Sequence, residues 1–501
     1  MWRDRALTCV LAVSCALAAA TASERPRYRV AWATYFGGSH WDQAREVIAY
    51  PDGSALVGGM TASSGLPTTA GVVQPKYGGD DPALGHGGIY GGDAFVVHLS
   101  ADGTTILAAT YFGGSRQERG VYGMALDSKA NIVIGSATRS PDLPTTEGCY
   151  QRKYGGAKAD MYAAKLSPDL TKLLWCTYVG ASKTDWPRGG LAVDDEDNVY
   201  LVGGTDSPDF PLTEGAYQRQ RKGKRDAAIV KLKADGSELL WSTLLGGGDA
   251  EGLMGVRVDA SGVYVAGHTQ SRDFPVMPGA AQATVGGKSD CLLAKLSRGG
   301  GRLLYGTYLG GTENEFAEHR PFLCRDGSVL LTGVTASPDF PTTEGAFQPR
   351  FRGKTDGFLT KLSPDGKRLV FSTFLGGSDG EFFLMPTPDA QGNIYIVGTS
   401  RSRDLPVTPD ALQSRFAGAA GKWDGDGVLA VVSRDGSKLL YATYLGGSGA
   451  DLIRGIALGP NGEVFLAGST SSRDFPTTAN AMQKKIGGQT DAFVVKLVPH
   501  R

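Results

Sequence analysis

One repeat of about 66 residues recurs seven times and accounts for most of the 501-residue chain. Its first marker is a glycine doublet or near-doublet that follows an aromatic or aliphatic residue. The doublets begin at Gly37, Gly113, Gly180, Gly246, Gly310, Gly376 and Gly446. Self-similarity at such a period is the signature of a repeat architecture, in which each copy forms one supersecondary unit that cannot bury its apolar surface alone.

Two further markers follow each doublet in a constant order. The second is a short motif that ends in an apolar residue and proline, and it begins at Gly65, Asp142, Asp209, Asp273, Asp339, Asp404 and Asp474. The third is an aspartate before an apolar run, found at Asp93, Asp160, Asp226, Asp290, Asp356, Asp426 and Asp491. Three markers, each present seven times in one order, predict seven equivalent units.

Each repeat has the pattern of four short strands. In the last repeat, apolar segments at 453–458 and 463–468 flank a Pro-Asn-Gly turn, and a long loop leads to a third segment at 492–497. In the repeat before it, a fourth segment at 439–445 follows an Asp-Gly turn. This fourth segment carries a fixed threonine, at Thr34, Thr110, Thr177, Thr243, Thr307, Thr373 and Thr443. Threonine suits a half-buried pleated surface, and four antiparallel strands per unit are typical of a propeller blade.

The two ends of the chain predict how the ring closes. The last repeat stops after its third strand, whereas residues 28–36 form an isolated fourth strand ahead of the first complete repeat. Pairing these segments would remove two open sheet edges, which are otherwise sites of aggregation. We therefore expect an all-β fold, a single seven-bladed β-propeller of four antiparallel strands per blade, that spans residues 23–501.

Residues 1–22 have the layout of a secretory signal peptide. Arg3 and Arg5 precede an apolar run at 6–19, and Ala-Thr-Ala at 20–22 fits a cleavage site. The run is too short for a transmembrane helix. A lipoprotein signal at Cys15 is the alternative. The sequence thus predicts an extracytoplasmic protein, in the periplasm, on the cell surface or outside the cell, without membrane insertion.

Composition narrows the choice of partners. The 51 basic and 51 acidic side chains balance, which argues against nucleic-acid binding because such proteins carry a basic excess. We expect a monomer.

Four cysteines follow the signal peptide: Cys149, Cys176, Cys291 and Cys324. Their spacing fits no zinc site, so the alternatives are buried thiols and a Cys149–Cys176 disulfide.

The repeat motifs resemble a known family. The elements Tyr-Leu-Gly-Gly, Asp-Phe-Pro-Thr-Thr and Asp-Ala-Phe-Val-Val-Lys-Leu are similar to those of the bacterial SBBP-type β-propeller repeat proteins. The resemblance covers the whole chain after the signal peptide. It implies an extracytoplasmic, repeat-built protein, and it implies neither a catalytic activity nor a ligand.

One face of the predicted ring holds the long loops. Loops between strands two and three, and between strand four and the next strand one, share this face, here called the top face; binding residues concentrate on such loops. An acid stands five residues after each doublet begins, at Asp42, Glu118, Asp185, Glu251, Glu315, Glu381 and Asp451. These oxygens suit Ca²⁺, the one candidate ion, at the mouth of a central channel. The alternative, which we favour, is that each acid caps backbone N–H groups, because a feature of every blade serves the blade.

Departures from the repeat are more informative about ligands. The inner strands differ at Arg45, Tyr122, Met254, Leu384 and Arg454, and one-residue insertions fall in blades three and five. A site for an anionic or polar small ligand is predicted at Arg45, Arg188, Glu318, His319 and Arg454. The alternative is a set of channel charges solvated by water.

Two top loops are basic. They carry Arg219, Arg221, Lys222, Lys224 and Arg225 in blade three, and Arg350, Arg352 and Lys354 in blade five. A basic sector on a neutral protein favours contact with a polyanion such as an acidic or sulfated glycan. The alternative is an ordinary solvated loop.

The sequence contains no His-Glu-x-x-His, Gly-x-Ser-x-Gly or phosphate-loop motif. Our first hypothesis is a secreted or surface binding module without catalytic residues or a cofactor, whose partner is a polysaccharide, anionic glycans in particular, or a surface protein. The alternative is a glycan-active hydrolase or lyase. It would use Glu251, Glu315, Glu318 and His319, because glycosidases need a carboxyl pair.

Overall fold

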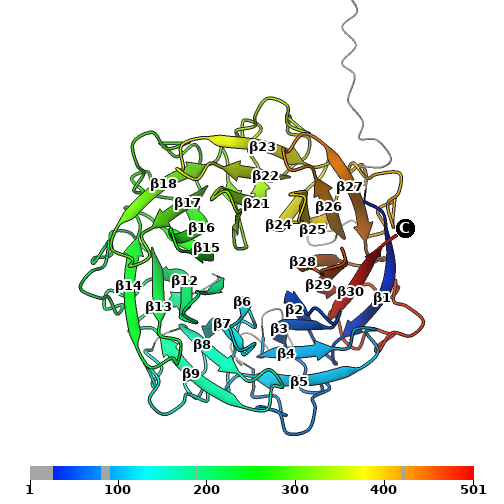
Figure 1. Ribbon diagram of the computed structural model, residues 1–501, viewed down its shortest axis with the longest axis horizontal. Coiled ribbons are helices and arrows are strands. Elements are labelled where there is room, and N and C mark those ends of the chain that lie inside the picture. The colour runs from blue at the N-terminus through cyan, green and yellow to red at the C-terminus, as the bar shows by residue number, and fades with distance from the viewer. Residues whose placement is uncertain (1–25, 81–90, 157, 187–189, 419–424, 501) are drawn as a thin grey trace, which may run out of the picture.

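The computed structural model describes residues 26–80, 91–156, 158–186, 190–418 and 425–500, which form a ring of seven antiparallel sheets (Figure 1). In each sheet the first strand lies innermost and the fourth outermost. The predicted signal peptide and Arg188 lie outside the described residues. Within the described part, no helical segment has the length and hydropathy of a membrane span.

The first four blades have these strands. Blade one comprises β2 (Asp42–Ala49), β3 (Ala55–Thr61), β4 (Asp93–Leu99) and β5 (Ile106–Phe112). Blade two comprises β6 (Gly123–Leu126), β7 (Ile132–Thr138), β8 (Asp160–Leu166) and β9 (Leu173–Val179). Blade three comprises β10 (Asp185–Trp186), β11 (Leu191–Val193), β12 (Val199–Thr205), β13 (Asp226–Leu232) and β14 (Leu239–Leu245). Blade four comprises β15 (Glu251–Asp259), β16 (Gly262–Thr269), β17 (Asp290–Leu296) and β18 (Leu303–Leu309).

The remaining blades complete the ring. Blade five comprises β19 (Glu315–Phe316), β20 (Phe322–Leu323), β21 (Val329–Thr335), β22 (Asp356–Leu362) and β23 (Leu369–Leu375). Blade six comprises β24 (Glu381–Pro388), β25 (Ile394–Ser400), β26 (Asp426–Val432) and β27 (Leu439–Leu445). Blade seven comprises β28 (Asp451–Leu458), β29 (Val464–Thr470), β30 (Asp491–Pro499) and β1 (Tyr28–Phe36).

The predicted closure is confirmed. The sheet of blade seven has the order β1-β30-β29-β28, so the first strand of the chain pairs with its last. The two strands are antiparallel, from Tyr28 opposite Pro499 to Phe36 opposite Ala492. In Figure 1 the dark blue β1 lies beside the red β30 on the outside of the ring. Blade seven is therefore assembled from both ends of the chain.

Blades pack face to face through apolar side chains. One buried cluster, for example, combines Phe112 of blade one with Tyr162 of blade two, whose rings stack 5.8 Å apart. A second contact joins the outer strands to the next blade. Gly103 has φ +68°, and a Cβ there would meet the Trp32 ring at 2.3 Å; Gly236 and Trp175 repeat the arrangement at 2.5 Å. The Asp-Gly turn thus needs glycine both for its backbone angle and for interblade packing.

The innermost strands are bulged. In blades one, four and seven the pairing shifts by one residue at Arg45, Met254 and Arg454. A one-residue bulge bends its strand and re-aims the side chain. The residues that vary between repeats are therefore the bulge residues of strands next to the ring axis.

Blade five has one residue more at this place. There, residues 317–321 face only residues 331–333 of β21, and the first strand is divided into β19 and β20. Blade three is divided in the same way into β10 and β11. Both insertions were predicted. Blade two also has the extra residue, since residues 119–122 face only residues 136–137. The sequence interpretation missed it because alignment of the repeats on Gly123 concealed the added residue.

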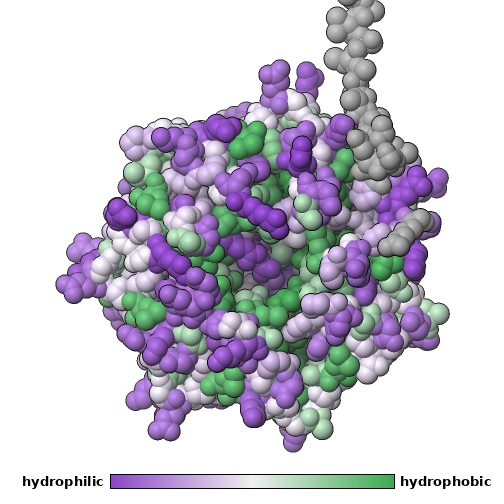
Figure 2. Space-filling view, viewed as in Figure 1, coloured by the Kyte–Doolittle hydropathy of each residue, from purple (hydrophilic) through white to green (hydrophobic). Residues whose placement is uncertain are grey.

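Exposed hydrophobic residues are scattered over the surface. Figure 2 shows one face of the ring, hollowed at its centre, with hydrophobic residues scattered among hydrophilic ones. Most of the large apolar side chains that are exposed sit singly on outer strands, as Leu107 does on β5 and Leu174 on β9. Single exposed apolar residues are normal in soluble proteins, so these give no sign of a docking patch.

Candidate functional site

The seven recurrent acids bind the loops of their own blades. Each accepts a hydrogen bond from the backbone N–H four residues earlier, at 2.7–3.0 Å. Each is at most 2% exposed. Burial raises the pKa of Asp42 to about 6 and that of Glu381 to about 7. These carboxylates do not face an open channel mouth, and the described residues contain no group of three or more His, Cys, Asp or Glu side chains that could hold a metal ion.

A ring of glutamines, which the sequence interpretation overlooked, completes these loops. Each glutamine side chain accepts the N–H of the first residue of a doublet, as Gln282 does from Gly310 at 2.9 Å. Its backbone N–H donates to the fixed threonine, here Thr307 at 3.0 Å. The set is Gln74, Gln151, Gln218, Gln282, Gln348, Gln413 and Gln483. A glutamine at one register position in all seven repeats was the available signal.

The predicted ligand residues of blades one, five and seven meet at the ring axis. Glu318 Oε1 lies 3.1 Å from Arg45 Nη2 and 3.1 Å from Arg454 Nη1. Arg45 is fully buried, and its guanidinium stacks 3.6 Å from the centre of the Tyr122 ring. Because blade five is not adjacent to blade seven or blade one, Glu318 must reach across the axis. The loop 317–321, here called the axial loop, therefore spans the centre of the ring.

Neighbouring residues extend this contact. Arg320 Nη1 lies 2.6 Å from Glu46 Oε1 of blade one. A Cβ at Gly255 of blade four would meet Arg320 Cα at 2.0 Å, so glycine is required there for the close approach. The axial loop is thus held by blades one, four and seven.

The electrostatics of the axial loop are set by burial and by arginine. Burial opposes ionisation of Glu318, yet Arg454 and Arg45 hold its pKa at about 2. Burial, assisted by Arg45, lowers the pKa of His319 to about 3. Glu318 is therefore ionised and His319 neutral at pH 7. A glutamate held this way is a poor general acid, because a general acid near neutral pH needs a raised pKa.

A hollow of about 480 Å³ opens on the top face beside the axis. It is lined by residues of blades two to five: Arg139, Lys158, Thr184, Trp186, Gly204, Asp206, Arg225, Gly252, Leu253, Met254, His268 and Phe316. We call it the top hollow. Met254 lines it, and the next residue, Gly255, contacts the axial loop. The axial loop therefore lies directly behind the wall that Met254 provides.

The top hollow combines positive charge with aromatic rings. Among the described residues of its lining, Arg139, Lys158 and Arg225 are the basic side chains and Asp206 is the one carboxylate. Asp206 accepts two hydrogen bonds from Arg225, at 2.8 and 3.0 Å. Phe316 packs on His268 with ring centres 5.1 Å apart. Of these lining residues, the sequence analysis singled out only Arg225, as part of a basic loop, and Met254, as a variable residue of an inner strand.

Trp186 occupies another part of the wall. The Arg119 guanidinium lies 4.1 Å from the centre of its ring, a distance at which a cation is attracted to an aromatic face. The contact fixes the indole at the entrance to the hollow.

The two predicted basic loops lie on the top face but are partly neutralised. Lys224 pairs with Asp249, and Lys354 pairs with Asp379, both at 3.1 Å. Arg225 pairs with Asp206, as described. Exposed side chains of the set are Arg219, Lys222, Lys224, Arg350, Arg352 and Lys354, whereas Arg221 and Arg225 are partly buried.

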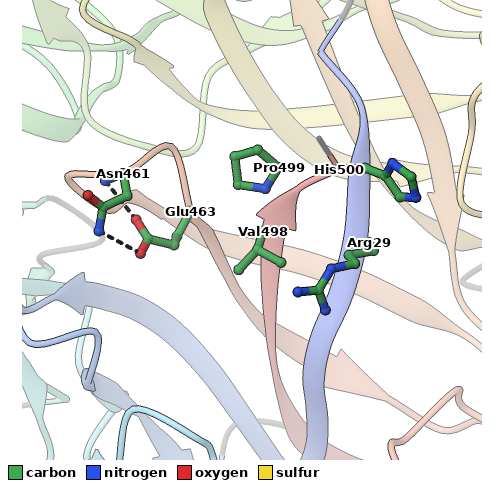
Figure 3. A pocket seen from close by; sticks show the side chains of 6 residues that line it. All are labelled: Arg29, Asn461, Glu463, Val498, Pro499 and His500. Atoms are coloured by element: carbon green, nitrogen blue, oxygen red, sulfur yellow. Dashed lines mark hydrogen bonds between the residues drawn. The ribbon is translucent and has the colours of Figure 1, made fainter.

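A second hollow, of about 430 Å³, lies at the seam of blade seven (Figure 3). Arg29 of β1 and Val498 of β30 line one side, and Asn461 and Glu463 line the other. The Glu463 carboxylate accepts the backbone and side-chain N–H of Asn461, at 2.8 and 3.2 Å. The polar groups of this second hollow thus support the turn between β28 and β29.

The four cysteines of the described residues are free thiols. Cys176 and Cys291 are buried, and Cys149 and Cys324 are partly buried. Cys149 approaches Cys176, since both belong to segments that hydrogen bond to Thr146, but no disulfide joins them. Burial raises the pKa of the Cys324 thiol, which keeps it in the unreactive protonated form.

Solved structures similar to this chain include a protein of unknown function from Dyadobacter fermentans, at 11% identity over 95% of this chain and 100% of that chain, with a TM-score of 0.42. The WD40 beta-propeller domain of Doa1 has 10% identity over 95% and 98%, with a TM-score of 0.42. The Pan2 WD40 domain of Neurospora crassa has 6% identity over 95% and 97%, also at 0.42.

No curated protein matches the sequence significantly. Residues 440–476 match the SBBP family, described as a Beta-propeller repeat. This segment includes the last Tyr-Leu-Gly-Gly and Asp-Phe-Pro elements on which the resemblance was based. The chain therefore carries the SBBP β-propeller repeat, as its motifs predicted.

Proposed function

We propose that the protein is an extracytoplasmic binding module whose top hollow takes an acidic glycan. One observation carries the proposal: the described residues that line a hollow of about 480 Å³ include three basic side chains and a single carboxylate, which is already paired. Its volume falls within the range of about 300–1,000 Å³ typical of small-ligand sites. Arginine and lysine donate strong, charge-assisted hydrogen bonds to carboxylate and sulfate oxygens.

The aromatic residues suit a sugar ring. Trp186 and Phe316 line the same hollow as the basic groups. An aromatic body combined with polar neighbours is the usual composition of a site for a ligand with both apolar and polar faces. A uronic acid has this character, with C–H groups on its faces and a carboxylate at its edge.

The basic loop of blade three extends the site outward. Arg225 lines the top hollow and also ends the run that begins at Arg219. A longer acidic chain bound in the hollow would therefore meet exposed basic side chains of the same loop. This continuity favours a polysaccharide over an isolated small acid.

The enzymatic alternative lacks support from the geometry. Asp206 is the one carboxylate among the described lining residues, whereas a glycosidase needs two. Glu251 and Glu315 are buried in their blades and hydrogen bonded there. We therefore propose binding without hydrolysis, and an assay for reducing sugar released from acidic polysaccharides tests that part separately.

Calorimetric titration with uronic-acid oligosaccharides and with neutral oligosaccharides of equal length tests binding. We expect heat of binding from the acidic series only. Lys158→Gln and Arg139→Gln should each weaken it about tenfold, since a hydrogen bond to a charged group contributes about 1.5–3 kcal/mol. Lys129→Gln, an exposed lysine of a bottom turn, is the matched control and should bind normally. Equal binding of neutral sugars, or unchanged affinity in both variants, would reject the proposal.

A further inference from the structure

The axial loop concentrates positive charge in the interior. The described residues around it contribute four arginines and two glutamates: Arg45, Arg257, Arg320, Arg454, Glu46 and Glu318. Arg257 belongs to the set because its pKa, lowered by burial to about 9, is also affected by Arg320 and Glu46. It remains charged at pH 7. The described cluster therefore holds two more positive than negative charges.

His319 does not change this balance. Its pKa of about 3 keeps the imidazole neutral at pH 7. The charged groups that affect its pKa most are Arg45, Glu318, Arg454 and Arg320. Removal of charges from water is costly unless each is paired, so the excess calls for a counterion.

Two polar atoms mark where a counterion would sit. His319 is 3% exposed, and its Nε2 has no hydrogen-bond partner among the described residues. Nε of Arg320 is likewise buried without one, although Nη1 of the same side chain pairs with Glu46. Buried polar groups nearly always have a partner, from protein, water or ion. Both atoms can donate a hydrogen bond, which suits an acceptor of negative charge.

We propose that the axial cluster binds one small monovalent anion, of the halide class, against His319 Nε2 and Arg320 Nε. The anion neutralises part of the charge excess and supplies the acceptor that the two atoms lack. It also fixes the axial loop in the centre of the ring. This site is separate from the top hollow, so the inference does not depend on glycan binding.

Bromide is the probe, because its anomalous scattering identifies it in crystals. We expect an anomalous peak beside His319 and Arg320 in crystals of the full protein grown or soaked with sodium bromide. In solution, urea unfolding is measured at constant ionic strength while bromide replaces isethionate, a larger organic anion. Above its Kd, each tenfold rise in bromide should raise the folding equilibrium constant about tenfold.

Arg320→Met removes one donor and one charge, and its folding constant should not respond to bromide. Arg302→Met removes an exposed arginine and should respond as the wild type does. The proposal is overturned if the wild-type crystals show no peak at the axis, or peaks only beside surface arginines as adventitious ions. An equal bromide response in Arg320→Met would also overturn it. If that variant fails to fold, the anomalous peak and the bromide dependence of unfolding of the wild-type protein still decide whether the anion site exists.

Discussion

Removal of β1 tests whether the first strand is structurally part of the last blade. The strand buries five apolar side chains: Tyr28, Trp32, Ala33, Tyr35 and Phe36. At about 1.5–3 kcal/mol for each large apolar side chain, the four larger ones contribute about 6–12 kcal/mol. Native proteins are stable by only about 5–15 kcal/mol. A chain that begins at Ser39 should therefore lose most or all of its stability and expose the edge of β30.

The assay compares thermal and urea unfolding of the full and shortened proteins. A synthetic peptide of residues 26–38 should restore the melting transition of the shortened protein as its concentration rises, because it can pair with β30 in the register of β1. Trp32→Ala is a milder test, since loss of a buried tryptophan costs about 3–5 kcal/mol. Leu107→Ala, on the outer strand of blade one and 49% exposed, should change stability by about 0.5 kcal/mol or less.

One result would refute the reasoning. If the shortened protein melts cooperatively at the temperature of the full chain, and the peptide has no effect, then β1 does not complete blade seven in solution.

Three further predictions concern the axis, the blades and the basic loop. His319 has a folded pKa of about 3 against about 6.5 when unfolded; the folded state binds fewer protons at this residue in between, so the contribution of His319 to stability should fall by about 1.4 kcal/mol per pH unit as pH drops through this window. Buried acids with raised pKa values, such as Asp42 and Glu381, act in the opposite direction, so the measurement is the difference in slope between the wild type and His319→Phe in urea titrations at pH 4–6.5. Tyr308→Phe removes a buried donor 2.8 Å from the Ser271 carbonyl and should cost about 1–3 kcal/mol in the same measurement; no loss would mean that this hydroxyl is not structural. Retention on a heparin-like column should fall steeply with salt, because exposed charges are screened beyond about 10 Å at 0.1 M. It should disappear, with stability unchanged, when the five basic residues of blade three are replaced by serine: Arg219, Arg221, Lys222, Lys224 and Arg225. Retention that survives this replacement would exclude these residues as the polyanion-binding site.

Much of the fold was readable from the sequence, because its determinants are local and repeat. The three markers recur in one order at similar spacings, and the hydrogen bonds around them are local, such as the bond from Gly447 to the recurrent acid Asp451. The closure was also readable, since one repeat lacks a strand and the chain supplies one elsewhere. The capping glutamines had the same periodic signal and were overlooked.

The residues at the axis were only partly predictable. Insertions showed that blades three and five depart from the repeat, but not where the added residue goes. Glu318 meets Arg45 and Arg454, respectively 273 and 136 residues away in sequence, only because the closed ring brings strands of separate blades to one axis. The top hollow depends still more on the ring, because four blades line it. Net charge likewise could not reveal that Lys224 and Lys354 are paired with aspartates of neighbouring loops.

The sequence by itself determined the number of blades, the strands of each blade and the closing strand. Tertiary structure alone decided how Glu318 meets Arg45 and Arg454 at the axis, and that four blades line the top hollow. The physical reason is the sequence separation of the interacting residues. Hydrogen bonds within a repeat join residues that are close in sequence, whereas the charged and aromatic side chains at the axis meet only through the curvature and closure of the whole propeller.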